Sequence, residues 1–228
     1  MVEPRELSDE DGALLVSIAR RAIEEIVLNG SRYEPPREVR ERFRRPGMTF
    51  TTIERIEGEG RYSLRGCIGF LAPVKSLIDS VIDSAIEAAI NDPRFPRLEP
   101  WELDTVVIEV TVLSVPKPIP VAKRTELPSK VVIGLHGLVA RRGFHQGTLL
   151  PSVPLEYCWD EETFLAETCV KAFMSPDCWL DPSVVIEAYE GIAFRELEPR
   201  GRVVRRNLAE EYARTCRASS VSPRPLAE

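Results

Sequence analysis

Residues 60–71 read Gly60-Arg61-Tyr62-Ser63-Leu64-Arg65-Gly66-Cys67-Ile68-Gly69-Phe70-Leu71. This pattern predicts a β-strand, and side chains in a strand point alternately to its two faces. Alternation assigns four apolar side chains to one face, namely Tyr62, Leu64, Ile68 and Phe70. It assigns Ser63, Arg65 and Cys67 to the other face. The first face can enter a core, so we expect the second to present a thiol beside a guanidinium, with bare backbone at Gly66 and Gly69.

The neighbouring segments predict how this strand is paired. Residues 48–56 are rich in threonine and β-prone. Residues 57–60 contain two glycines and are typical of a hairpin turn. We therefore expect residues 60–71 to lie antiparallel to residues 49–56. Apolar residues recur at helical spacing in the following segment, which predicts a helix at about 74–90.

The rest of the chain predicts an α+β fold, with a mostly antiparallel sheet flanked by helices. Helices are expected at 8–29, between a Ser8 cap and a Gly30 end, from the prolines at 35 and 36 to about 45, at 161–174 after an Asp160 cap, and at 202–217. Strands are expected at 105–115, 131–133, 137–141, 147–150 and 184–194. Residues 219–228 are rich in serine and proline, and we expect them to be frayed.

Composition limits the classes of function. The chain has 228 residues, 43% hydrophobic and 29% charged, with a formal net charge of −6. An acidic chain lacks the general basic surface that nucleic acid requires, so we expect no nucleic-acid partner. No apolar run approaches the roughly 18 residues of a membrane span, and the N-terminal segment lacks an apolar signal core. These features predict a cytoplasmic protein that does not enter a membrane.

Five cysteines, an odd number at wide spacings, are present: Cys67, Cys158, Cys169, Cys178 and Cys216. Because no C-x-x-C pair occurs, neither a zinc ribbon nor a thioredoxin-type pair is expected. We expect no bound metal and no cofactor. In a reducing cytoplasm the cysteines should be free thiols, whereas a hyperthermophilic source would permit internal disulfides. Cys169 lies on the inner face of its expected helix, which is typical of a core residue.

Several segments together resemble the AMMECR1 family. They are LRGCIG at 64–69, NDPRF at 91–95, IEVTVLS at 108–114, GTLLP at 147–151, Trp159-Asp160, and the helix that contains Phe164-Leu165, Cys169 and Lys171-Ala172. These segments occur in the family's order and cover about residues 10–198. Two small departures are Ser152, where the family usually has glutamine, and Ala172-Phe173-Met174, where it usually has Ala-Gly-Leu.

The resemblance implies a domain at 8–198, with a larger α+β part and a smaller lobe within about 116–150. It also implies a cleft between them, lined in part by the LRGCIG strand, and leaves 199–228 as a partly helical or disordered tail. The family has no settled activity. In prokaryotes, members of this family resemble one part of a set of three proteins, of which the other two are a Memo-like protein and a radical SAM protein. The resemblance therefore implies these two proteins as partners.

Cys67 is the candidate catalytic residue. The thiolate is the reactive form of cysteine, and we expect the nearby Arg65 to lower the pKa of the thiol. Gly66 and Gly69 would let a ligand, or another backbone segment, come close to this strand. The competing interpretation is a structural cysteine packed in a core beside structural glycines.

Other residues are candidates for a catalytic base beside Cys67 and for ligand binding. A nucleophilic cysteine needs a base, and the two histidines, His136 and His145, are unsupported candidates. Arg94 is a candidate to bind an anion, or else it pairs with Asp92 beside it. Glu109 should lie on the polar face of its strand. The candidate ligand-binding residues are therefore Arg65, Gly66, Gly69, Arg94 and Glu109.

Two classes of function remain open. The first is an enzyme or enzyme component of a redox or modification pathway, with a cleft built around LRGCIG that binds a small anionic or peptide-like ligand. The second is a non-catalytic adaptor that binds a protein partner through the same cleft. An accessible, reactive Cys67 would favour the first class, and a Cys67 packed in the core beside a large exposed apolar patch would favour the second.

Overall fold

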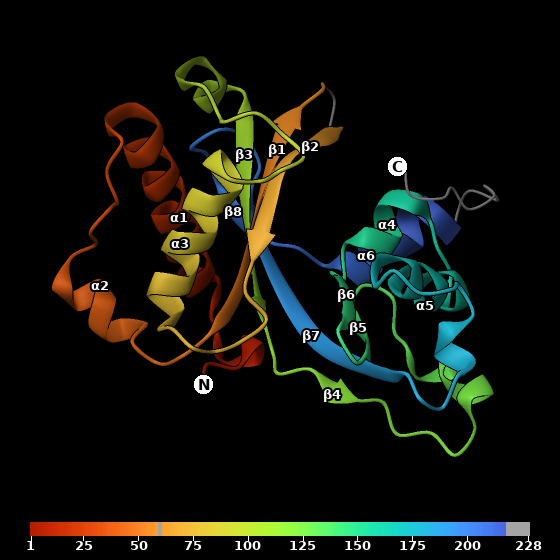
Figure 1. Cartoon of the computed structure of the whole chain (residues 1–228). Coiled ribbons are helices and arrows are strands. Elements are labelled where there is room, and N and C mark those ends of the chain that lie inside the picture. The colour runs from red at the N-terminus through yellow and green to blue at the C-terminus, as the bar shows by residue number, and fades with distance from the viewer. Residues whose placement is uncertain (59–60, 218–228) are drawn as a thin grey trace. The chain divides into compact units, whose positions relative to one another are not determined.

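The computed structural model describes residues 1–58 and 61–217 and divides the chain into two compact units (Figure 1). The first unit comprises 1–114 and 192–206, and the second comprises 115–191 and the C-terminal segment from 207. Helices and antiparallel strands occur in both units, which confirms the predicted α+β class. The β7 strand (Val185–Glu196) begins in the second unit and ends in the first.

The described residues of the first unit form three α-helices and most of a sheet. Its elements are η1 (Pro4–Glu6), α1 (Asp9–Asn29), α2 (Arg37–Arg42), β1 (Met48–Ile56), β2 (Tyr62–Gly69), α3 (Leu77–Ile90), η2 (Pro100–Asp104), β3 (Val106–Leu113) and β8 (Val203–Arg205). The strand order is β2-β1-β3-β7, and β8 pairs with β7. The pairs β1–β2, β1–β3 and β7–β8 are antiparallel. The pairing of β2 with β1 was predicted from the sequence.

The long first helix begins and ends at the residues that its sequence predicts. Ser8 accepts a hydrogen bond from the Asp11 backbone N–H, and Asp11 reaches back to the Ser8 N–H, so both free donors are satisfied. Gly30 ends the helix with φ 67°, a left-handed conformation that glycine adopts at low cost. The helix therefore presents one continuous apolar stripe, including Leu15 and Ile23, to the core.

One face of the β1–β3 sheet is covered by α1 and α3 (Figure 1). Ile53 and Ile108 enter the apolar core on this face. Thr51 also faces the helices, because its hydroxyl lies 2.8 Å from that of Ser84 in α3. Side chains alternate along β1, so Thr52 and Glu54 point to the opposite face. Glu109 of β3 lies opposite Thr52, so this second face carries a group of polar side chains.

A β-bulge changes the predicted faces of β2. Ile53 pairs with Gly66, but Glu54 pairs with Leu64, so Arg65 is an extra residue. One extra residue reverses the alternation. Residues 62 and 64 therefore share the face of Cys67 rather than that of residue 68, and the prediction that the four apolar residues share one face was wrong.

The second unit is built on the first part of β7. Its elements are β4 (Lys117–Pro118), η3 (Arg124–Glu126), η4 (Pro128–Lys130), β5 (His136–Arg142), β6 (His145–Leu149), α4 (Val153–Tyr157), α5 (Glu161–Lys171), η5 (Cys178–Leu180), α6 (Leu208–Tyr212) and η6 (Ala213–Arg217). β4 and β5 both pair with β7, and β6 pairs with β5. Asp160 caps α5 as predicted, and Trp159 beside it is fully buried.

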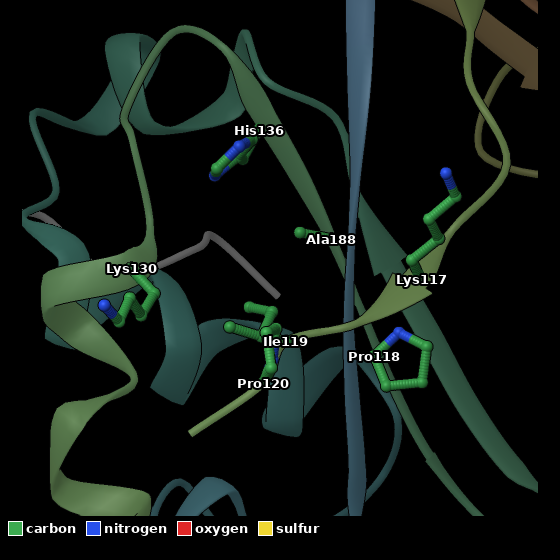
Figure 2. Close-up of a pocket in the computed structure, with 7 residues that line it drawn as sticks. All are labelled: Lys117, Pro118, Ile119, Pro120, Lys130, His136 and Ala188. Atoms are coloured by element: carbon green, nitrogen blue, oxygen red, sulfur yellow. The ribbon is translucent and has the colours of Figure 1, made fainter. Parts of the chain in front are cut away.

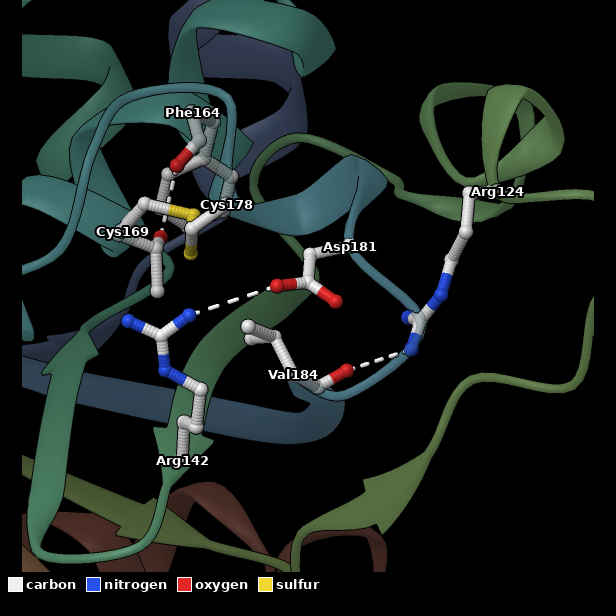
Figure 3. The surroundings of a disulfide bond; sticks show 8 residues. Arg124, Arg142, Phe164, Cys169, Cys178, Asp181 and Val184 are labelled. Carbon is white, nitrogen blue, oxygen red and sulfur yellow. Dashed lines mark hydrogen bonds and ion pairs between the residues drawn. A yellow bond between two sulfur atoms is a disulfide. The ribbon is translucent and has the colours of Figure 1, made fainter.

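Two disulfides join four of the five cysteines in the second unit. Cys158 is bonded to Cys216, and Cys169 to Cys178, which leaves Cys67 as the free cysteine. Figure 3 shows the second bond between α5 and η5, close to the Arg142–Asp181 ion pair. The expectation of free thiols was wrong for these four residues, because the fold brings widely spaced cysteines together.

Two predicted elements take another form. The segment 131–133 forms no strand and continues from η4 into a turn. The predicted helix at 202–217 is instead strand β8 followed by α6 and η6, because Val203 and Val204 pair with Glu196 and Arg195 of β7. Part of the turn predicted at 57–60 and the segment 219–228 lie outside the described residues. Across 1–58 and 61–217, no helix combines the length and apolarity needed to cross a membrane.

Candidate functional site

A row of polar side chains crosses three strands of the first unit on the face opposite α3. Thr52 lies directly opposite Cys67 on one side and Glu109 on the other, so the row runs from β2 through β1 to β3. Arg206 continues it, because its guanidinium donates to the Glu109 carboxylate at 2.8 Å. We call Cys67, Thr52, Glu109 and Arg206 the polar row.

The thiol of Cys67 is held in its neutral form. The residue is half-buried, and burial raises the pKa of the thiol to about 11. A hydrogen bond from the Thr52 hydroxyl, at 3.3 Å from Sγ, and the charge of Arg94 lower the pKa. The carboxylates of Glu109 and Asp92 raise it again. The expectation that an arginine on the strand would lower this pKa was wrong, because Arg65 makes its contacts elsewhere.

A second charged pair lies beside the polar row. Glu54, two residues from Thr52 on the same face, accepts a hydrogen bond from Arg195 at 3.2 Å. Burial raises the pKa of Glu54, and the nearby Glu109 carboxylate raises it further, while Arg195 and Arg206 lower it. Two carboxylates and two guanidinium groups therefore share this face.

Arg195 has an unused donor. Its guanidinium carbon lies 4.2 Å from the centre of the Tyr62 ring, a position typical of a cation–π contact. Its Nε is buried and has no hydrogen-bond partner within the described part of the chain. Buried polar atoms are nearly always paired, so an unpaired nitrogen on this face is an exception among the described residues.

The NDPRF loop binds the backbone of Cys67. The Cys67 N–H donates to the Asp92 carboxylate at 2.8 Å, and Arg94 donates to the Cys67 carbonyl at 3.2 Å. Arg94 also binds Asp92 through two hydrogen bonds, so the pairing that the sequence left open is present. These contacts pair the Cys67 backbone at the outer edge of β2, where it would otherwise be open for pairing with another strand.

Arg65 is bound to the same loop and does not contact the thiol. Its guanidinium donates two hydrogen bonds of 2.8 Å to the Glu102 carboxylate, and both side chains are more than nine-tenths buried. It also donates to the carbonyls of Pro96 and Arg97. This position follows from the bulge, and it makes Arg65 a connection between β2 and residues 96–102.

The two glycines of the motif allow close packing. A Cβ at Gly66 would lie 2.3 Å from the Ala88 carbonyl oxygen in α3. A Cβ at Gly69 would lie 2.3 Å from the Phe50 ring and 2.4 Å from the Thr49 carbonyl. The sequence left two explanations for these glycines, close approach of a ligand or of another backbone segment. At Gly66 the close approach of the α3 backbone has direct support.

The histidines belong to the other compact unit. The His136 Nδ1 accepts a hydrogen bond from the Val132 N–H at 3.1 Å, and His145 is exposed. Within residues 1–58 and 61–217, no three His, Cys, Asp or Glu side chains are grouped so that they could hold a metal ion.

Sequence patterns identified part of this site. Cys67 and Glu109 were predicted, and they share one face on either side of Thr52. Thr52, Glu54, Arg195 and Arg206 were missed. Alternation along β1 would have placed Thr52 and Glu54 together, but no local signal marks the two arginines, which come from the β7–β8 hairpin.

The arrangement is suited to binding more than to thiolate chemistry. Arginine recognises carboxylate and phosphate groups through paired donors, and the Nε of Arg195 is unpaired among the described residues. A thiol with a pKa of about 11 is almost entirely protonated at neutral pH. The polar row can therefore offer hydrogen bonds and balanced charge to a polar ligand.

Comparison with known proteins identifies relatives along nearly the whole chain. The sequence model of the AMMECR1 family matches residues 16–194. A protein of Thermococcus gammatolerans is 45% identical over 202 residues, which cover 89% of this chain and 98% of that protein. A protein of Saccharolobus solfataricus is 46% identical over 206 residues, which cover 88% of each chain. The crystal structure of an uncharacterised protein from Pyrococcus horikoshii is similar with a TM-score of 0.85 and 42% identity, and the match covers 89% of this chain and all of that one. The chain belongs to the AMMECR1 family.

Proposed function

We propose that this protein is a ligand-binding component of a redox or modification pathway and binds a small anionic or peptide-like ligand at the polar row. The observation that carries the proposal is the alignment of Cys67, Thr52 and Glu109 across three neighbouring strands, completed by Arg206. Strands β1, β2 and β3 form a rigid support of the kind on which precise binding sites are built.

The charges of the site support a ligand with both an acceptor and a donor. Arg195 has a buried, unpaired Nε–H, and a carboxylate or a peptide carbonyl that displaces the neighbouring side chains would give it an acceptor. The raised pKa of Glu54 means that this carboxyl group can also donate when it is protonated. A peptide-like anion has a carboxylate or carbonyl oxygen that can accept from Arg195, and it has polar groups that can interact with Glu54.

Cys67 is the candidate reacting group in this proposal. Because burial raises the pKa of its thiol to about 11, it is not a ready nucleophile in the unliganded protein. A bound ligand or partner would have to remove the proton. The Memo-like protein and the radical SAM protein implied by the family resemblance are the partners that we propose, and the cytoplasm is the proposed location.

Protection of Cys67 from alkylation tests the proposal. Iodoacetamide would be reacted with the native protein near pH 10, with and without N-acetylglycine, which has one carboxylate and one peptide bond. We expect saturable slowing of Cys67 alkylation, with half-protection in about the millimolar range for so small a ligand. Uncharged N-acetylglycinamide should protect much less, because it lacks the anion.

Two arginine variants separate specific ligand binding at Arg195 from the general effect of removing a positive charge. Arg195→Met should abolish the protection, while Arg202→Met, an exposed arginine of the same hairpin, should retain it. Circular dichroism would establish that both variants are folded. Equal protection by the charged and uncharged probes, or full protection in Arg195→Met, would refute anion binding at this site.

A second candidate function is a non-catalytic adaptor. Trp101 is 68% exposed and lies next to Glu102, which holds Arg65 of the LRGCIG strand. Exposed tryptophans are frequent anchors at protein interfaces. Failure of every small probe to protect Cys67 would favour the adaptor over the ligand-binding protein.

A further inference from the structure

We propose that a pocket in the second unit binds a small organic anion that has a carboxylate or phosphate head group and a compact apolar body. The pocket lies among β4, the residues that follow it, η4, the start of β5 and the middle of β7 (Figure 2). All of its lining residues belong to the second unit, so the proposal is independent of the polar row.

The pocket has the size and walls of a small-molecule site. Its volume is about 340 Å³, at the lower end of the range for ligand pockets. Its apolar walls come from Pro118, Ile119, Pro120 and Ala188. Such walls can remove a small hydrocarbon group from water, which is favourable in proportion to the apolar area that is buried.

The polar lining is cationic. Lys117 and Lys130 line the pocket, and in Figure 2 they lie on opposite sides of Ala188 with their ammonium groups directed away from one another. Within the described residues neither ammonium group has a hydrogen bond or ion pair. The whole chain has five lysines, Lys75, Lys117, Lys123, Lys130 and Lys171. Two unpaired lysines around one hollow, in a chain of net charge −6, favour an anionic occupant.

His136 adds a neutral donor to the lining. Its Nδ1 accepts a hydrogen bond from the Val132 N–H, so the proton of the neutral ring lies on Nε2. Burial lowers the pKa of His136, although the charge of Glu190 opposes the shift. At neutral pH the pocket therefore offers two positive charges and one N–H group, a combination suited to a carboxylate or a phosphate.

The backbone around the pocket is held in place. Ala188 lies opposite Lys117 of β4 on one side and Leu138 of β5 on the other. The Ile119 N–H donates to the Ile186 carbonyl at 3.0 Å, which fixes the segment after β4. Pro118 and Pro120 flank that residue and restrict the backbone further. A site that is ordered before binding loses less entropy when its ligand arrives.

Titration calorimetry of the full chain with three aromatic probes tests this inference. Benzoate and phenyl phosphate carry the two head groups, and benzamide has the same ring without a charge. We expect benzoate or phenyl phosphate to bind with a dissociation constant below about 5 mM, and the tighter of the two identifies the preferred head group. Benzamide should bind at least about tenfold more weakly, because it lacks the charge.

Lysine variants tie the binding to this pocket. Lys117→Gln and Lys130→Gln should each weaken the tighter anion by about tenfold, the effect of losing one charged hydrogen bond. Lys123→Gln is the matched control, because Lys123 is exposed, lies in the same segment and does not line the pocket. Lack of binding of both anions, equal binding of benzamide, or unchanged binding in the Lys117→Gln/Lys130→Gln double variant would overturn the proposal.

Discussion

Glu102→Gln should lower the free energy of unfolding by about 3–5 kcal/mol, because it leaves the buried Arg65 guanidinium without a counter-charge. Both side chains are at least 93% buried, and two hydrogen bonds of 2.8 Å join them. Glu102 also accepts from Arg55 at 2.6 Å and from the Glu99 N–H at 3.0 Å. Chemical unfolding in urea, followed by circular dichroism, would measure the loss.

The same variant should show a defined dependence on pH. Burial alone raises the pKa of Glu102, but hydrogen bonds from Arg65, the Glu99 N–H and Arg55 bring it down to about 2. Because the folded pKa lies below the unfolded value of about 4.3, the ionised carboxylate stabilises the protein above that pH. The stabilisation is lost as the pH falls toward 2, so the difference between wild type and variant should shrink over that interval.

Glu38→Gln is the matched control, since Glu38 is exposed on α2 and forms no ion pair among the described residues. It should change the unfolding free energy by less than about 0.5 kcal/mol. A Glu102→Gln variant as stable as Glu38→Gln would contradict this account of how the LRGCIG strand is held.

Removing the Cys158–Cys216 disulfide should cost about 4 kcal/mol, because that bond closes a loop of 58 residues. A long loop has much conformational entropy in the unfolded chain, and the crosslink removes that entropy. The bond ties the end of α4 to η6, and Tyr212 of α6 donates to the Trp159 carbonyl at 2.8 Å in the same region. Cys158→Ala/Cys216→Ala would be compared with wild type by urea unfolding.

The Cys169–Cys178 bond supplies the comparison. Its loop spans only 9 residues, so Cys169→Ala/Cys178→Ala should lose about 2.5 kcal/mol from the same entropic term. Thiol titration of the wild-type protein in denaturant should give one free thiol, that of Cys67. Three or more free thiols in the protein as isolated, or a larger loss for the shorter loop, would contradict the assigned pairing.

Local signals were sufficient for α1, for β1 and for the pairing of β1 with β2 in the first unit. The Ser8 cap and Gly30 end were predicted for α1, and the threonine-rich segment at 48–56 forms β1. Antiparallel pairing of β1 with β2 followed from the short turn between them. These predictions succeeded because capping, β-propensity and turn length act over a few residues.

Features that depend on distant contacts were not predicted. The bulge at Arg65 is stabilised by Glu102, which lies 37 residues away in sequence. Val203 and Val204 were predicted to be helical, but the final part of β7 offers them strand partners. The arginines at 195 and 206 reach the site through the β7–β8 hairpin. The periodicity of the sequence predicts neither the Arg65–Glu102 contact nor the pairing of β7 with β8.

The central claim is that Cys67 is a neutral thiol within a polar binding site, and its alkylation rate against pH tests this most directly. Iodoacetamide would be applied to the native protein, with Cys67→Ser as the control for other sites. Thr52→Val should raise the apparent pKa, because the Thr52 hydroxyl lowers it, and Glu109→Gln should reduce the apparent pKa, because that carboxylate raises it.

For the wild-type protein we predict an apparent pKa of about 11. At pH 7 the reactive thiolate fraction should then be about 300-fold below that of an ordinary cysteine with a pKa of about 8.5, and alkylation correspondingly slow. An apparent pKa below 8.5, with rapid alkylation at pH 7, would contradict the account and identify Cys67 as an activated nucleophile.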